Sequence, residues 1–213
     1  GADRVDLAVS RTGLGEVSVS NGGLLDLGGQ GHVYVGGMGT LGVAGSGNLT
    51  IAGAGSRLIG VHDAWIGVTP EDLGDGTVTP ANPGTLTLVH GGVFGNAGAT
   101  TNISTMGTLN AMNATVGGNL NLHNGFVSTV HAGTRVTDPV TFETFPNTLH
   151  VTGNLTNNAG NATIFMGYTP NGADQITVDG GLAVNGGRLE VMLDGNDIFY
   201  QYAQGMSAAL ITY

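Results

Sequence analysis

One short pattern recurs along the chain: an apolar residue, a polar residue and a second apolar residue, usually close to glycine. It occurs as Leu49-Thr50-Ile51, Leu86-Thr87-Leu88, Leu120-Asn121-Leu122, Leu149-His150-Val151, Ile176-Thr177-Val178 and Leu189-Glu190-Val191. Alternation of this kind is typical of β-strands that bury one face. Because the chain rebuilds the same strand-and-turn unit many times, we expect the units to stack as the coils of a β-solenoid.

Glycine separates these runs and accounts for 40 of the 213 residues. With only 6 prolines and no strict Gly-X-Y period, the sequence excludes a collagen triple helix. The apolar fraction of 40% is too high for a disordered glycine-rich linker. We therefore predict that the glycines occupy tight corners, where a positive φ is common and a Cβ is costly.

Two dipeptides, Asn21-Gly22 and Asn124-Gly125, are also typical of the two-residue turns of antiparallel hairpins. A meander or a β-sandwich therefore stays open as an alternative architecture. The strands are short and closely similar, however, and aromatic residues make up only 6% of the chain. These features favour a parallel β-helix, whose narrow interior suits Val, Leu, Ile and Ala.

Two segments, residues 68–84 and 132–147, interrupt the pattern with prolines and charged residues. We expect both to be loops inserted into a single β-solenoid domain over residues 1–213, whose C-terminal coils span about residues 148–213. Loops on a solenoid often carry specificity because they are free of the stacking constraint. The first loop also offers three carboxylates as weak cation candidates, Glu71, Asp72 and Asp75.

Charge is sparse and acidic, since 15 Asp and Glu residues stand against 5 Lys and Arg and the net charge is −10. The sequence lacks the positive surface that nucleic acids and anionic membranes attract, so both partners are disfavoured. No apolar run is long enough for a membrane-spanning helix. The lack of cysteine excludes disulfides, thiolate metal sites and a cysteine nucleophile.

The six histidines form neither a His-x-x-x-His pair nor a His-Glu-x-x-His motif. His62-Asp63 is the adjacent pair of a histidine and a carboxylate, and we expect the histidines to face solvent or to stack on neighbours. Asp194-Gly195-Asn196-Asp197 resembles one repeat of a calcium-binding β-roll, but a single copy is interpreted as a turn. The carboxylates are scattered and no serine-nucleophile elbow is present. We therefore predict no catalytic residue, no cofactor and no metal site beyond the weak candidates above.

Several motifs follow one another in a definite order: Gly55-Ser56, then Trp65-Ile66-Gly67, then Gly84-Thr85-Leu86-Thr87-Leu88 with Gly91-Gly92 after it. This series resembles the repeats of bacterial autotransporter passenger domains and related surface proteins. Residues 153–155, 173–182 and 186–191 are similar to the last coils of such passengers, and residues 209–213 are similar to the strand that follows them. The motifs are degenerate, so they indicate architecture better than function.

The resemblance implies a single-stranded right-handed parallel β-helix and a location outside the cell, at the bacterial surface. It also implies roles in adhesion, self-association or scaffolding. The sequence departs from the family pattern because no membrane barrel follows Tyr213, so we expect a processed or truncated passenger, or a free secreted relative.

We expect a structural protein and not an enzyme, self-associating head to tail as the subunit of a surface filament or biofilm matrix. The reason is that the terminal coils of a solenoid expose strand edges that can pair with another chain. The alternative is a monomeric adhesin that binds surface glycans or proteins through its loops, and a polysaccharide-degrading β-helix enzyme is the third possibility. The predicted self-association residues are Val5, Leu7, Val9, Val17, Val19, Ile198, Tyr200, Tyr202, Leu210 and Tyr213.

Overall fold

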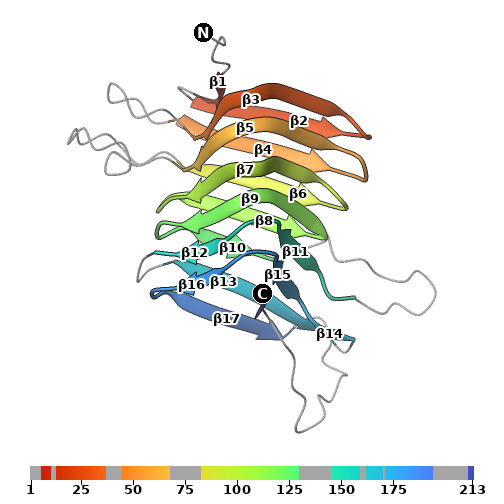
Figure 1. Cartoon of the computed structure of the whole chain (residues 1–213), viewed down its shortest axis with the longest axis vertical. Coiled ribbons are helices and arrows are strands. Elements are labelled where there is room, and N and C mark those ends of the chain that lie inside the picture. Colours follow the sequence, from red (N-terminus) through yellow and green to blue (C-terminus); the bar gives the residue numbers. More distant parts are fainter. Residues whose placement is uncertain are drawn as a thin grey trace, which may run out of the picture.

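The computed structural model describes residues 6–10, 13–36, 45–67, 83–129, 145–158, 162–169, 171–193 and 211–213. These residues form β-strands joined by turns. Within these ranges there is no helix long and apolar enough to cross a membrane. Figure 1 shows the strands lying one above another along the long axis of the molecule.

The strands belong to two sheets, and along most of the chain they alternate between them. The first sheet contains β1 (Asp6–Val9), β3 (Leu24–Val35), β5 (Arg57–Ile66), β7 (Val93–Ile103), β9 (Ala114–Leu122), β11 (Thr148–Val151), β12 (Leu155–Asn157), β15 (Gln175–Val178), β16 (Leu182–Val184) and β18 (Ile211–Thr212). The second sheet contains β2 (Gly13–Ser20), β4 (Gly45–Ala52), β6 (Gly84–Val89), β8 (Gly107–Met112), β10 (Phe126–Ser128), β13 (Thr163–Thr169), β14 (Gly172–Ala173) and β17 (Arg188–Leu193).

The recurring triplets pair in parallel and in register, as the sequence predicts. Leu49 of β4 pairs with Leu86 of β6, which pairs with Leu109 of β8. Among the described strand pairs, β13 and β14 alone run antiparallel. The hairpin alternative is wrong for Asn21-Gly22, because β2 and β3 on either side of it pair with β4 and β5 and not with each other. The described part is an all-β structure of parallel strands, which is consistent with a β-solenoid.

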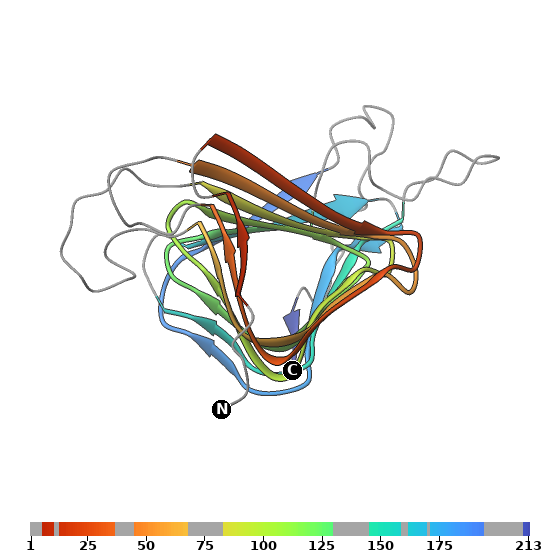
Figure 2. The same ribbon diagram turned by 90° about the horizontal axis from the view of Figure 1, so that it is seen from above.

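The long strands of the first sheet bend, and the stack has a roughly triangular outline when seen from above (Figure 2). The pairing of β3 with β5 is irregular between Asp26 and Gly31, and Gly28 and Gly29 within this stretch have φ angles of 74° and 82°. Glycine adopts this left-handed region without the steric cost of a Cβ, so the prediction of corner glycines with positive φ is confirmed here. After the strands of the second sheet, Asn21, His90 and Asn113 occupy the same region, with φ between 52° and 54°.

A second row of glycines lies at or near the start of strands in the second sheet. These glycines allow the backbones of successive coils to approach each other closely. Gly84 pairs with Gly47 on one side and with Gly107 on the other. A Cβ on Gly107 would lie 2.9 Å from the carbonyl carbon of Ile66 and 3.0 Å from the backbone nitrogen of Ser104, and closer still to the Ile66 oxygen. Glycine is therefore required where each coil turns against the backbone of the one before it.

The inward side chains of successive coils stack into a continuous apolar core. Leu49, Leu86 and Leu109 have no exposed surface, and Phe94 is the bulkiest of the fully buried side chains. Among the described residues, Oγ1 of Thr101 is a buried side-chain oxygen that has no hydrogen-bond partner. Burial of this apolar column is the main favourable contribution to folding.

Residues 68–82 of the first predicted insertion and residues 132–144 of the second lie outside the described residues. The segments that flank the second insertion are held by one buried carboxylate. Asp174 accepts hydrogen bonds from Thr129 Oγ1 at 2.7 Å and from the backbone nitrogen of Asn147 at 2.8 Å. A buried polar contact therefore joins the two segments that flank the insertion in sequence.

Candidate functional site

A β-bulge in β5 places two neighbouring polar side chains on the same outer face of the first sheet. The residue before His32 pairs with Val61, while His32 itself pairs with Asp63, so His62 is an extra residue on β5. Val61 is buried, whereas His62 and Asp63 both reach the surface. In a regular strand two consecutive side chains point to opposite faces, and a bulge removes that constraint. The N–H of Val61 donates to Asn96 Oδ1 at 2.8 Å, which supports the bulge from β7.

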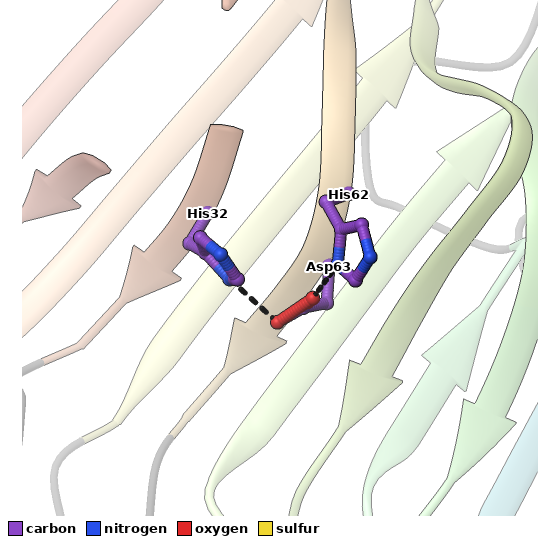
Figure 3. A group of neighbouring side chains, drawn as sticks. All are labelled: His32, His62 and Asp63. Atoms are coloured by element: carbon purple, nitrogen blue, oxygen red, sulfur yellow. Dashed lines mark hydrogen bonds and ion pairs between the residues drawn. The ribbon is translucent and has the colours of Figure 1, made fainter. Parts of the chain in front are cut away.

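Asp63 lies between the two imidazole rings (Figure 3). Nδ1 of His32 lies 2.7 Å from Oδ2 of Asp63, and Nδ1 of His62 contacts Oδ1. The centroids of the two rings are 5.5 Å apart. Because an ionised carboxylate only accepts hydrogen bonds, each Nδ1 carries a proton and donates it to Asp63.

The cluster lies at the surface without being fully solvated, with 21% of the His32 side chain, 26% of Asp63 and 59% of His62 exposed. Partial burial raises the pKa of the Asp63 carboxyl, but hydrogen bonds from His62 and His32 outweigh burial, and the pKa lies below its ordinary value. Two imidazole nitrogens and a carboxylate oxygen thus lie within 4.8 Å of one another. This donor set suits a divalent transition-metal ion.

Aromatic side chains continue this outer face beside the cluster. Tyr34 pairs across the strands with Trp65, and its ring stacks with His32 at a centroid distance of 6.5 Å. Trp65 in turn stacks with His123 at 6.0 Å. Nε2 of His123 lies 3.3 Å from Oδ1 of Asn102, which is buried. The prediction that histidines stack on neighbours is confirmed for His123, and the rings give the cluster a packed border.

A shallow polar groove of about 430 Å³ lies on the outer face of the second sheet. Its hydroxyl and amide side chains repeat from strand to strand, because the outward positions of β2, β4, β6 and β8 are in register. Beyond the groove the same rows continue to Phe126 and Phe165, whose ring centroids are 4.8 Å apart. The groove is lined by Glu16, Val17, Ser18, Asn48, Thr50, Thr85, Thr87 and Asn110.

The apolar core is open at both ends of the described stack. In the middle coils, inward residues such as Leu86 and Leu109 are fully buried. Val184 and Leu189, on the last strands of their rows, are 61% and 48% exposed. The partly buried apolar side chains that pack against the core all belong to the first or the last coils: Leu7, Val17, Leu25, Leu182 and Ile211.

The predicted self-association residues fall only partly at these ends. Leu7 and Val17 are partly buried at the N-terminal end, and Tyr213 is 84% exposed at the C-terminal end. Val9 and Val19 are buried in the core. The remaining candidates, Val5, Ile198, Tyr200, Tyr202 and Leu210, lie outside the described residues, as do the cation candidates Glu71, Asp72 and Asp75.

Sequence reasoning identified His62-Asp63 as a pair but missed His32, which lies one coil earlier. A signal was available, because Val33-Tyr34-Val35 and Ala64-Trp65-Ile66 share the same alternation of apolar and aromatic residues. Aligning these two runs places His32 opposite Asp63, as the structure does.

No protein-family model matches this chain, and comparisons with curated proteins and with solved structures found no match. Fold and site therefore define a class only: an all-β protein of stacked parallel strands with a polar groove and a histidine–aspartate cluster on its outer faces.

Proposed function

We propose that this chain is an extracellular structural protein of a bacterial surface that associates end to end. In this proposal it is a right-handed parallel β-helix, like the autotransporter passengers that its motifs resemble. The observation that carries the proposal is the exposure of core residues at both ends of the stack and not in its middle.

The two ends are chemically complementary because they terminate the same rows of side chains. Val17 begins a row that continues through Leu49 and Leu86 and ends at Leu189. A second copy in the same orientation would bring its Val17 against Leu189 and continue the row. Fully burying a side chain of this size stabilises by about 1.5–3 kcal/mol, and several rows would be continued together.

The backbone favours the same arrangement. Among the described strands, β2 pairs with β4 alone and β17 pairs with β13 alone. A strand with one neighbour presents a free edge to another chain. Because the contact joins two different ends, it does not close on itself and would produce a filament.

Sedimentation velocity over a concentration series, with electron microscopy of the same samples, tests the proposal. The expected result is a mass that rises with concentration and thin unbranched fibres. Val184→Lys and Leu189→Lys place a charge in the C-terminal end of the core and should abolish association. Met106→Lys is the matched control, because Met106 is 39% exposed but lies on a middle coil. A wild-type chain that stays monomeric at its solubility limit would contradict the proposal.

A monomeric adhesin is the second candidate, and the polar groove is the observation that favours it. The groove offers repeated hydroxyl and amide groups for hydrogen bonds, and the Phe126–Phe165 pair beyond it on the same sheet face offers an apolar surface. This combination is suited to an extended glycan, since few fixed polar groups and aromatic surface define most binding sites. The groove therefore offers a place for recognition in addition to the predicted loops.

Glycan binding by the wild type, a groove variant and a loop deletion distinguishes the groove from the first loop as the binding site. Thr50→Ala with Thr87→Ala should abolish binding if the groove is the site, and deletion of residues 70–82 should abolish it if the first loop is the site. An unaltered affinity in both variants would remove the adhesin proposal in either form.

A further inference from the structure

We propose that His32, His62 and Asp63 form a binding site for one divalent transition-metal ion, with Zn²⁺ as the ion of reference. The site is distinct from the proposed end-to-end contact, because its side chains lie on the outer face of β3 and β5, whereas that contact joins the inward rows of the core.

The donor atoms determine the class of ion. Two imidazole nitrogens and one carboxylate oxygen are borderline ligands of the kind that Zn²⁺, Co²⁺, Ni²⁺ and Cu²⁺ prefer. Ca²⁺ takes six or more oxygen ligands, and this cluster supplies one carboxylate. The site should therefore discriminate strongly against Ca²⁺.

The geometry needs little rearrangement to accept the ion. Two ligand atoms at zinc-ligand distance from a tetrahedral ion are about 3.3 Å apart. Nδ1 of His32 and Oδ2 of Asp63 are 2.7 Å apart and all three ligand atoms lie within 4.8 Å of one another, so rotations of the side chains would bring them to this spacing. The ion takes the place of the two protons that the rings share with Asp63. Each proton moves from Nδ1 to Nε2 of its own ring, so a neutral imidazole stays neutral.

The bulge is the structural feature that assembles the ligand set. Without the extra residue in β5, His62 and Asp63 would lie on opposite faces of the sheet, and the third donor would be lost. The hydrogen bond from Val61 to Asn96 fixes the bulged backbone. The exposed side of His62 leaves one coordination position open to water, as in zinc sites with three protein ligands.

A second histidine–aspartate contact provides a control within the same chain. Nε2 of His150 lies 2.9 Å from Oδ1 of Asp179, and the two side chains are 41% and 53% exposed. The pair has one imidazole and one carboxylate and forms no group of three among the described residues. It should not hold a metal ion with comparable affinity.

Isothermal titration of the untagged, EDTA-treated full chain with zinc chloride tests the proposal. We expect one high-affinity ion per chain and no saturable binding of calcium chloride. His62→Gln and His32→Gln should each weaken zinc binding by about tenfold or more, and His150→Gln should leave it unchanged. Circular dichroism of each variant checks that the fold is retained. His62→Gln is the variant least expected to disturb the fold, because the His62 side chain is more exposed than those of His32 and His150.

Cobalt(II) gives a second readout, because a low-coordinate nitrogen and oxygen site produces intense visible absorption bands that an aqueous ion does not. The wild-type chain should show these bands, and Asp63→Asn and His62→Gln should lose them. The proposal is overturned if zinc does not bind, if the His32 and His62 variants bind it as tightly as the wild type, or if calcium competes equally.

Discussion

Replacing Gly107 with alanine should destabilise the fold, because the new Cβ has no space at this corner. It would lie 2.9 Å from the carbonyl carbon of Ile66 and 3.0 Å from the backbone nitrogen of Ser104, with the Ile66 oxygen closer still. These are backbone atoms, from the preceding coil at Ile66 and from the adjoining turn at Ser104, so no side chain can rotate away. Overpacking costs about 1–3 kcal/mol, and we expect the upper end, which corresponds to a fall in Tm of about 6–12 °C for a chain of this size.

Urea unfolding followed by circular dichroism measures this effect, and Gly181→Ala is the matched control. The nearest atom to a Cβ on Gly181 is Oδ1 of Asn154 at 3.4 Å, an ordinary contact distance. This control should be neutral or slightly stabilising, since alanine restricts the unfolded chain. Equal destabilisation by the two substitutions would refute the argument that close backbone approach selects glycine at residue 107.

Three further predictions concern polar groups in and around the core. Thr101→Val should stabilise the protein by about 1 kcal/mol in urea unfolding, because it removes a buried hydroxyl that has no partner in the described structure. Asp174→Ala should destabilise by about 3 kcal/mol in the same assay, because it leaves the buried N–H groups of Asn147 and Gly167 without this acceptor and leaves Thr129 Oγ1 only the longer contact to the Phe165 carbonyl at 3.3 Å. In metal-free protein, the Asp63 carboxyl has a folded-state pKa below its unfolded value. Its ionised form therefore stabilises the fold at any pH above the unfolded pKa. This stabilisation is lost as the pH falls through the folded pKa. The stability difference between the wild type and Asp63→Asn should therefore be present at pH 7 and shrink under acid conditions, and a difference that grows on acidification would show the opposite sign.

The fold could be predicted from the sequence wherever one strand resembles the next. Leu49-Thr50-Ile51 and Leu86-Thr87-Leu88 share one phase, and parallel in-register pairing buries their four apolar residues as two neighbouring rows of one core. The two roles of glycine could not be separated in this way. A positive φ at Gly28 and a close approach at Gly107 look alike in sequence, because the second depends on the backbone of another coil.

The candidate site was less accessible to sequence reasoning for a related reason. His62 and Asp63 are adjacent, which in a regular strand places them on opposite faces. The bulge that brings them together follows Gly60, whose φ is 72°, and its register depends on β3 and on Asn96 of β7. The open ends of the core were located only roughly, because Val184 and Leu189 become terminal through the order of the sheets and not through their own sequence.

Disulfide formation between paired strands tests the stacked parallel register most directly, and the chain has no cysteine to interfere. Thr85 of β6 pairs with Thr108 of β8 on the outer face, and neighbouring strands are about 4.8 Å apart, which suits a disulfide. The double variant Thr85→Cys with Thr108→Cys should oxidise readily, whereas Thr85→Cys with Asn110→Cys, offset by two residues to a separation of about 8 Å, should stay reduced. Cross-linking of the offset pair with the paired variant remaining reduced would contradict the register on which the fold, the metal site and the end-to-end contact all depend.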